Sequence, residues 1–205
     1  MTNHRGISKG RVIVLGAGGR VGRAAVAEAR TRGYEVTEAG RADGDVTSAA
    51  DVARLAAGHD AAVVAVHDQT AAPGVFFPAM ARALAAGLPQ AGVGRLVSVG
   101  LASVLPTGAG TLLMDTPGYP QEWREFYAGH GAGTEALREA APQALDWVVL
   151  SPAGDFDHAG GPAGGYAVAP ADAGSRITHA DFARALLDEI EVPSLHGTHA
   201  GVTGA

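Results

Sequence analysis

The sequence predicts an α/β fold in which a doubly wound parallel sheet forms one domain over residues 1–205. Short apolar and β-branched runs alternate with segments of helical spacing, and such repeated strand–helix units favour parallel strands joined by right-handed crossovers. Hydrophobic residues make up 47% of the chain and aromatic residues only 5%, which suits buried strands under alanine- and valine-rich helices. No linker interrupts the chain, so we expect a single domain.

The first half of the chain alternates strands and helices without a long break. Apolar and β-branched runs predict strands at 12–15, 34–39 and 61–66. Helical spacing of Val and Ala, together with a cap at Thr47 or Ser48 and stop signals at Gly87 and Pro89, predicts the intervening helices. These helices are expected at 20–32, 48–57 and 76–88.

The second half contains fewer regular elements and two long loops. The expected elements are a strand at 95–99, a helix at 121–140, a strand at 146–150, a short strand at 166–169 and a helix at 181–189. The segments 100–120 and 153–175 are rich in Gly and Pro and too long to be plain connectors. Ligands of doubly wound folds bind beyond the carboxyl ends of the strands, so we expect both segments to face a substrate, the later one as a small C-terminal loop region.

Charge and composition exclude several classes of function. A net charge of −6 without a dense basic stretch argues against nucleic-acid binding. The absence of cysteine excludes disulfides, thiolate chemistry and zinc–thiolate sites. The first ten residues carry Arg5 and Lys9 but no apolar signal-peptide region, and no later apolar run is long enough for a membrane span. We therefore expect a cytoplasmic protein, monomeric or homodimeric, that acts on a small molecule without a membrane partner.

The strongest motif is a glycine-rich turn between the strand at 12–15 and the helix at 20–32. It reads Gly16-Ala17-Gly18-Gly19-Arg20-Val21-Gly22, with the spacing G-x-x-G-x-x-G. Gly16 permits the tight turn, Gly19 lets backbone N–H groups approach a pyrophosphate, and Gly22 allows close packing of helix and strand. The context of strand, turn and helix predicts a Rossmann dinucleotide site formed by Gly16, Gly18, Gly19, Arg20, Val21 and Gly22.

The residues after the second strand bear on the choice of cofactor. Arg41 stands at the strand tip, where an arginine accommodates the 2′-phosphate of NADP(H). Glu38 is the alternative, because an acid here binds ribose hydroxyls and favours NAD(H), but it lies inside the predicted strand. Asp45 and Val46 are expected beside the adenine. The cofactor is therefore predicted to be NADP(H), with NAD(H) as the alternative.

Several motifs in the same order resemble the atypical short-chain dehydrogenases/reductases that include NmrA-like proteins and NADH-flavin reductases. The matching segments are the turn 16–22, Arg41, 44–47, 95–100, 115–118, 146–147 and 150–152, which together span most of the chain. The resemblance implies a Rossmann fold with NAD(P) bound at the first turn. It also implies that Ala65, Val66 and Ser98 line the cofactor's path and that Ser151 and Pro152 lie near the nicotinamide.

One departure from typical short-chain dehydrogenases concerns the proton donor. Their Tyr-x-x-x-Lys motif uses a lysine ammonium to lower the tyrosine pKa, whereas the corresponding helix here reads Tyr127-Ala128-Gly129-His130-Gly131. Tyr127 and His130 share a helix face and are catalytic candidates, as is Ser98 at a strand end. Core packing explains Tyr127 equally well, and Ser98 could simply cap a loop.

Further candidates lie in and beside the first long loop. Ser103, Asp115, Tyr119 and Trp123 are expected to face a substrate, where the two aromatic rings could stack on a planar molecule or anchor the loop by ordinary packing. His67 and Asp68 follow a strand and are expected to line a pocket. No metal site is predicted, because neither Asp155, Asp157 and His158 nor the pair His196 and His199 has a third partner at suitable spacing.

Three functions follow from these observations. The first is an NAD(P)H-dependent reductase lacking the Tyr-x-x-x-Lys motif, which transfers hydride to a small planar acceptor such as a flavin, a quinone or a carbonyl compound. The second is a non-catalytic NADP(H) sensor of the NmrA-like type. The third is a redox-neutral isomerase or epimerase that acts on a natural-product intermediate.

Overall fold

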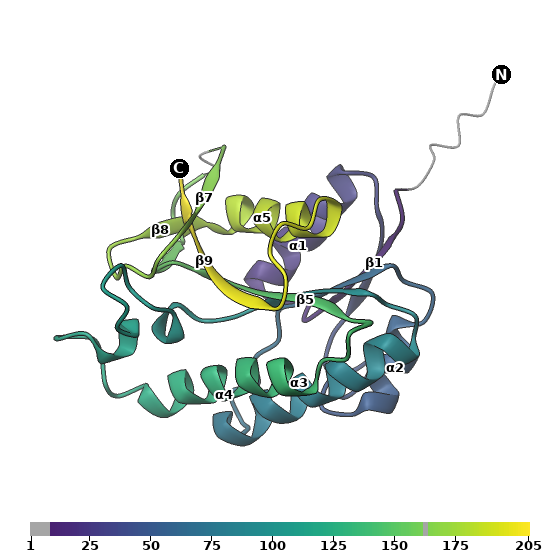
Figure 1. Ribbon diagram of the computed structural model, residues 1–205. Coiled ribbons are helices and arrows are strands. Elements are labelled where there is room, and N and C mark those ends of the chain that lie inside the picture. Colours follow the sequence, from purple (N-terminus) through teal and green to yellow (C-terminus); the bar gives the residue numbers. More distant parts are fainter. Residues whose placement is uncertain (1–8, 162–163) are drawn as a thin grey trace.

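A computed structural model describes residues 9–161 and 164–205 of the chain. Its main sheet has seven strands in the order β2-β1-β3-β4-β5-β9-β7 (Figure 1). These strands are β2 (Glu35–Ala39), β1 (Arg11–Leu15), β3 (Ala61–Val64), β4 (Arg95–Val99), β5 (Asp146–Pro152), β9 (Thr198–Gly204) and β7 (Tyr166–Ala169). All neighbours pair in parallel except β7, which runs antiparallel to β9. Most of the expectation about the first ten residues concerns positions outside the described chain.

Helices cover both faces of this sheet, which confirms the predicted doubly wound α/β fold (Figure 1). One face carries α1 (Arg20–Thr31) and α5 (His179–Glu191), and the other carries α2 (Ala49–Ala56), α3 (Pro73–Gln90) and α4 (Arg124–Ala140). Each face has its own apolar core, because successive strand residues point to opposite sides. Ile13 and Leu15 pack toward α3, for example, whereas Val12 and Val14 pack toward α1.

Local sequence signals explain where α2 and α3 begin. The Ser48 hydroxyl accepts a hydrogen bond from the Asp51 backbone N–H and caps α2, as one of the two expected caps. Pro73 stands at the first turn of α3, where no N–H donor is needed. This helix begins three residues before the expected position and continues through Gly87 and Pro89 to Gln90, because its buried face packs against both α2 and α4.

The C-terminal region differs most from expectation. No strand is predicted after 181–189, yet β9 lies between β5 and β7 and extends the main sheet. The expected loop 153–175 also contains β6 (Asp155–Asp157), which pairs with β8 (Arg176–Thr178), in addition to the correctly predicted strand β7. Threonine and glycine dominate β9, so its conformation depends on two neighbouring strands rather than on its own apolar pattern.

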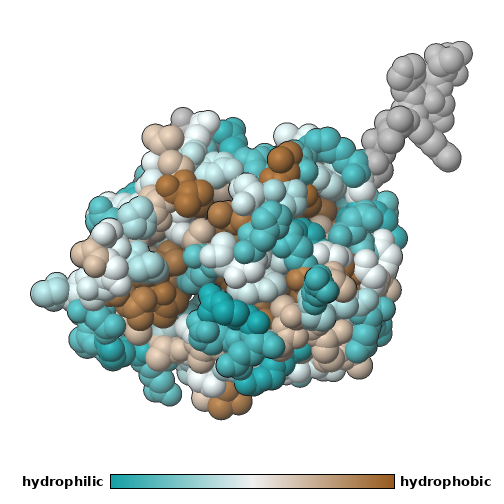
Figure 2. Space-filling view, in the orientation of Figure 1, coloured by the Kyte–Doolittle hydropathy of each residue, from teal (hydrophilic) through white to brown (hydrophobic). Residues whose placement is uncertain are grey.

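The loop after β4 is also partly ordered. It contains two short 3-10 helices, η1 (Ala102–Val104) and η2 (Leu113–Asp115), which pack around a small apolar cluster that includes Leu105. Figure 2 shows apolar atoms gathered over this loop on the left of the molecule, beside a mainly hydrophilic surface. Within the described residues, no helix combines the length and apolar character that a membrane span requires.

Candidate functional site

The carboxyl ends of β1, β2 and β3 open into a cleft of about 550 Å³, called here the nucleotide cleft. Exposed glycine backbone forms one wall and mixed polar and apolar side chains form the other. The predicted residues that line it are Gly16, Gly18, Gly19, Arg41, Asp45, Val46, Ala65 and Val66. His67 and Asp68, expected as pocket lining, line the same cleft. Residues from three separate loops therefore meet at one edge of the sheet.

The glycine turn has little room for side chains at two of its positions. Gly16 has φ +84°, and a Cβ there would lie 2.3 Å from the Ala65 carbonyl oxygen. A Cβ on Gly22 would lie 2.1 Å from the Gly16 carbonyl oxygen, so this glycine packs α1 against the turn rather than lining the cleft. Gly18 has no neighbouring atom within 4 Å of such a Cβ, and for Gly19 the nearest is at 3.4 Å. Open space therefore lies in front of the turn at the start of α1.

Arg41 lies at the nucleotide cleft, whereas Glu38 lies outside it. The Arg41 side chain is 74% exposed at the rim of the nucleotide cleft, and its Nη2 lies 3.3 Å from Asp68 Oδ1. Glu38 instead pairs with Arg30 on α1 at 2.6 Å and does not line the cleft. Asp68 also accepts hydrogen bonds from the backbone and hydroxyl of Thr70, which lower the pKa of its carboxyl group. The arginine is therefore the charged side chain available to a ribose phosphate.

A second cleft, of about 500 Å³, lies beyond the carboxyl ends of β4 and β5 and is called here the acceptor cleft. Ser103, Tyr119 and Tyr127 line it together with backbone from both long loops, including Gly154. The Ser103 and Tyr119 hydroxyl oxygens lie 2.8 Å apart, and the Tyr119 and Tyr127 rings meet edge to face at 5.6 Å. Burial raises the pKa of the Tyr127 phenol. Tyr127 is therefore a weaker acid than a free phenol.

Two of the predicted substrate residues lie outside both clefts. Asp115 accepts a hydrogen bond from Arg124 at 2.6 Å and so ties the loop to the first turn of α4. Trp123 precedes that helix and is 61% exposed. Neither side chain lines the nucleotide cleft or the acceptor cleft. Their role in the structure is at the loop–helix junction.

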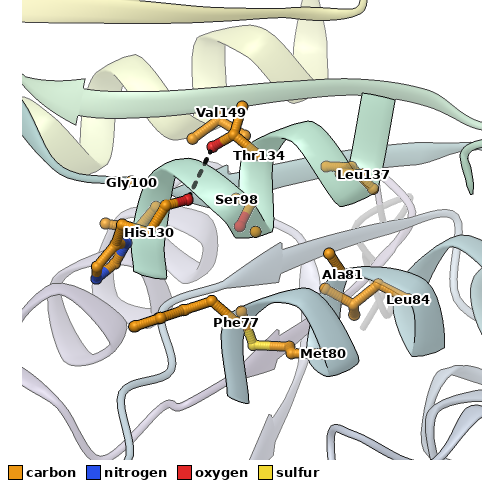
Figure 3. A pocket seen from close by; sticks show the side chains of 12 residues that line it. Phe77, Met80, Ala81, Leu84, Ser98, Gly100, His130, Thr134, Leu137 and Val149 are labelled. Carbon is orange, nitrogen blue, oxygen red and sulfur yellow. Dashed lines mark hydrogen bonds between the residues drawn. The ribbon is translucent and has the colours of Figure 1, made fainter. Parts of the chain in front are cut away.

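The side chains of His130 and Tyr127 line different cavities, although both residues lie on α4. His130 lines a cavity of only about 30 Å³ between α3, α4 and the sheet, together with Ser98 (Figure 3). Its ring centroid lies 3.8 Å from that of Phe77 and 4.8 Å from that of Phe126. Burial lowers the pKa of His130 to about 3, with smaller contributions from His67 and His199, so the imidazole is neutral near pH 7. A helix face shared by two residues does not by itself bring them to one site.

His199, considered from the sequence only as a metal ligand together with His196, makes a contact that sequence reasoning missed. Its Nε2 lies 2.7 Å from the hydroxyl of Ser151, which is fully buried at the end of β5. A Cβ on Gly100 would lie 2.7 Å from the Ser151 hydroxyl and 2.9 Å from His199 Nε2, so only glycine fits over this pair. Burial lowers the pKa of His199 to about 4. No sequence signal places it there, because β9 is not predicted.

The side chains considered as metal ligands contact other groups in the structure. His196 lies beside Asp146 at 2.9 Å, at the far end of β5 from Ser151 and His199. His158 contacts Arg20, and Asp157 accepts hydrogen bonds from the backbone of Ala159 and Gly160. In residues 9–161 and 164–205, no group of three or more His, Asp or Glu side chains is arranged to hold a metal ion.

Comparison with known proteins connects this geometry to a family. The model of a family described as NAD(P)H-binding matches residues 16–193, from the first glycine of the turn to beyond α5. The chain belongs to this NAD(P)H-binding family. YwnB of Bacillus subtilis, an uncharacterized protein, is 34% identical over 203 residues, which cover 89% of this chain and 93% of YwnB.

Two solved structures extend the comparison. A proposed epimerase from Bacteroides thetaiotaomicron is 26% identical with a TM-score of 0.81, and the match covers 95% of this chain and 96% of that one. A proposed NADH-flavin reductase from Streptococcus pneumoniae is 27% identical with a TM-score of 0.75, covering 96% and 100% of the two chains. Together with the family match, they confirm membership of the NmrA-like, atypical short-chain dehydrogenase/reductase group.

The nucleotide cleft fits the nicotinamide dinucleotide that this NAD(P)H-binding family uses. The open space in front of Gly18 and Gly19 is where a Cβ or a larger side chain would block a pyrophosphate. The apolar residues Ala65 and Val66 border the same space at the end of β3. A cradle of backbone and small residues at the start of α1 is what a Rossmann cofactor site requires.

Proposed function

We propose that this protein is an NADPH-dependent oxidoreductase that delivers hydride to a small planar acceptor, such as a flavin or a quinone. The observation that carries the proposal is the pair of clefts along one edge of the sheet. The nucleotide cleft suits a dinucleotide, and the acceptor cleft is lined by Tyr127, a phenol whose pKa is raised by burial and which is therefore a weak acid. Hydride transfer between stacked planar rings needs orientation more than a dedicated proton donor.

The residues of the nucleotide cleft have distinct roles in this proposal. The backbone from Gly16 to Gly19 would hold the pyrophosphate, and Arg41 would bind the 2′-phosphate of NADPH. Asp45 and Val46 would border the adenine. Each lies on the cleft wall, and the pairing of Glu38 with Arg30 leaves the ribose side without a competing carboxylate from β2. This arrangement favours NADPH over NADH.

The nicotinamide, which supplies the hydride when the cofactor is bound, would lie beside Ser98 and the end of β5. Ser151 and Pro152 form that end, and the bond from Ser151 to His199 fixes it. His130 has too low a pKa to donate a proton as an imidazolium, so it would contribute an uncharged hydrogen-bonding group near the cofactor. Ser98 and His130 are thus proposed as positioning residues.

The acceptor would lie between the tyrosine wall and the loop after β5. The Tyr119 and Tyr127 rings, packed edge to face, offer an apolar wall, and the hydrogen-bonded hydroxyls of Ser103 and Tyr119 leave one O–H donor at its edge. Because burial raises the pKa of Tyr127, this phenol is poorly suited to protonate an alkoxide that forms from a simple ketone. Flavins and quinones, which are protonated by solvent, suit the cleft better.

The test is NADPH oxidation by the purified protein with matched acceptors. Riboflavin and a small benzoquinone should be reduced, whereas aliphatic ketones and aldehydes should be reduced at least about a hundredfold more slowly. Turnover of ketones alone would contradict the proposal. Tight NADPH binding with no turnover of any acceptor would contradict it in favour of a cofactor sensor.

A redox-neutral reaction is the second candidate, because the Bacteroides structure with 26% identity is a proposed epimerase. Such an enzyme would consume no net NADPH and would exchange deuterium between solvent or cofactor and its substrate. Measuring label exchange without accumulation of oxidised cofactor separates this reaction from acceptor reduction. A cytoplasmic location and a monomeric or homodimeric state stay predictions, to be checked by fractionation and light scattering.

A further inference from the structure

Two basic side chains from distant parts of the chain meet beside the glycine turn. Arg20 is the first residue of α1, and its Nη1 lies 3.2 Å from Nδ1 of His158, which follows β6. The segment that carries His158 begins at Gly154, a residue that lines the acceptor cleft. Arg20 directly follows Gly19, which lines the nucleotide cleft, so this pair of basic side chains lies next to the turn where the pyrophosphate of a Rossmann dinucleotide binds.

The surrounding structure holds His158 in this position. The Asp157 carboxylate accepts hydrogen bonds from the backbone N–H groups of Ala159 and Gly160, which fixes the turn around His158. On the other side, the His158 ring lies 5.4 Å from that of His179, the first residue of α5. His179 in turn stacks on Phe156 at 4.4 Å. The imidazole is thus presented to Arg20 by packed neighbours rather than by a free loop.

The charges of this group favour an anion. A guanidinium donates to Nδ1 of His158 only when that nitrogen carries a lone pair, so the contact requires a neutral imidazole. The titratable and charged groups around His158 are Arg20, His179 and Asp157, and Arg176 lies near Asp157. The Asp157 carboxylate is occupied by its own turn. A phosphate between Arg20 and His158 would let both side chains carry positive charge.

We propose that Arg20 and His158 form the wall of the pyrophosphate site opposite the glycine turn, and that His158 takes up a proton when the dinucleotide binds. Neutral imidazole exchanges its contact with Arg20 for a charge-assisted hydrogen bond to a phosphate oxygen. The proton comes from solvent, and no covalent bond between heavy atoms changes. Cofactor binding would then strengthen as the pH falls.

The experiment is isothermal titration calorimetry of the full-length protein with NADH. NADH is the probe because it lacks the 2′-phosphate, whose own titration would obscure the result. Binding is measured at pH 6, 7 and 8, and at pH 7 in two buffers of different ionisation enthalpy. We expect net proton uptake on binding, and affinity about three- to tenfold higher at pH 6 than at pH 8.

Three substitutions assign the proton to His158. In His158→Gln, proton uptake and most of the pH dependence should disappear. In His158→Lys, which keeps a positive charge throughout this range, the affinity at pH 8 should approach that of the unchanged protein at pH 6, without proton uptake. Arg20→Gln should weaken binding at every pH. The matched control is His196→Gln, because His196 is exposed beside Asp146, far from the turn.

Two outcomes would overturn the proposal. One is NADH binding that takes up no proton and has the same affinity at pH 6 and pH 8. The other is unchanged proton uptake in His158→Gln, which would assign the proton to a different group. Circular dichroism of each variant confirms that binding is compared between folded proteins. None of these readouts depends on an acceptor, so they stand apart from the test of oxidoreductase activity.

Discussion

The two clefts of this protein are constructed in different ways. The nucleotide cleft is formed by short turns that directly follow β1, β2 and β3, and its central wall is glycine backbone. The acceptor cleft gathers Ser103, Tyr119, Tyr127 and Gly154 from a loop, a helix and a second loop. One site is determined by a contiguous motif and the other by tertiary packing. The contiguous motif is readable in the sequence, whereas for the acceptor cleft the sequence also proposes Asp115 and Trp123, which lie outside it.

The largest expected effect tests the backbone wall of the nucleotide cleft. In Gly19→Val the added methyl groups would fill the space in front of the turn, while the nearest atom to the new Cβ would be at 3.4 Å. We expect a folded protein whose NADPH affinity falls by about a hundredfold or more, because the pyrophosphate loses its backbone donors. Calorimetry measures the affinity, and thermal unfolding checks the fold.

Two further glycine substitutions sharpen this result. Gly74→Val places the same side chain at the start of α3, where no atom lies within 4 Å of the Cβ, and should bind NADPH normally. Gly22→Val should instead destabilise the fold itself, because its Cβ would overlap the Gly16 carbonyl oxygen. Normal NADPH affinity in a folded Gly19→Val protein would mean that the cofactor does not use this turn.

The second effect concerns the acceptor cleft. Tyr127→Phe removes one hydroxyl from a buried ring and should slow reduction of flavins and quinones by only a few-fold, through altered packing. If any carbonyl compound is reduced with Tyr127 as its acid, that activity should fall by at least about a hundredfold. Steady-state kinetics with both acceptor types at saturating NADPH make the comparison. Tyr34→Phe, remote from both clefts, is the control, and equal losses for both acceptor types would refute a proton-donor role.

The contrast between the clefts also explains what could be predicted from the sequence. The strands at 12–15, 95–99 and 166–169 and the residues of the nucleotide cleft follow from local patterns, since each turn directly follows its strand. The strand β9 does not, because it is ordered by pairing with β5 and β7, which lie far away in the sequence. His199 lies on this strand, so its contact with Ser151 could not be predicted either.

Helix periodicity is also limited as a guide to the residues of α4. It correctly puts Tyr127 and His130 on α4, but neighbouring elements determine which cavity each side chain lines. The Phe77 ring from α3 packs against His130, whereas the Tyr119 ring from the preceding loop packs against Tyr127 at the acceptor cleft. Spacing along one helix gives a face, and only tertiary packing divides that face between two cavities.

The third effect is the cofactor preference attributed to Arg41. Arg41→Ala should weaken NADPH binding by roughly tenfold or more and leave NADH binding nearly unchanged, since a charge-assisted phosphate contact contributes about 1.5–3 kcal/mol. Arg30→Ala is the matched control, because Arg30 pairs with Glu38 outside the cleft. Competition titrations with both nucleotides measure the ratio. Equal affinities for NADPH and NADH in the unchanged protein would remove the basis for this role.

The smallest effect concerns His130, which lines the small cavity between α3, α4 and the sheet. His130 has a folded-state pKa of about 3, lowered by burial, against an ordinary value of about 6.5 in the unfolded chain. Below pH 6.5 the unfolded state therefore binds a proton that the folded state does not. Stability that is fully present above pH 6.5 is lost as the pH falls from there toward about 3.

A substitution isolates the contribution of this one residue. His130→Phe keeps an aromatic ring against Phe77 and Phe126 but cannot be protonated. Between pH 7 and pH 5.5 the unchanged protein should lose about 1 kcal/mol more unfolding free energy than the variant. Urea denaturation at the two pH values measures both losses. Identical pH dependence in His130→Phe would mean that the His130 imidazole is hydrated in solution, and its neutral role beside the nicotinamide would then have to be abandoned.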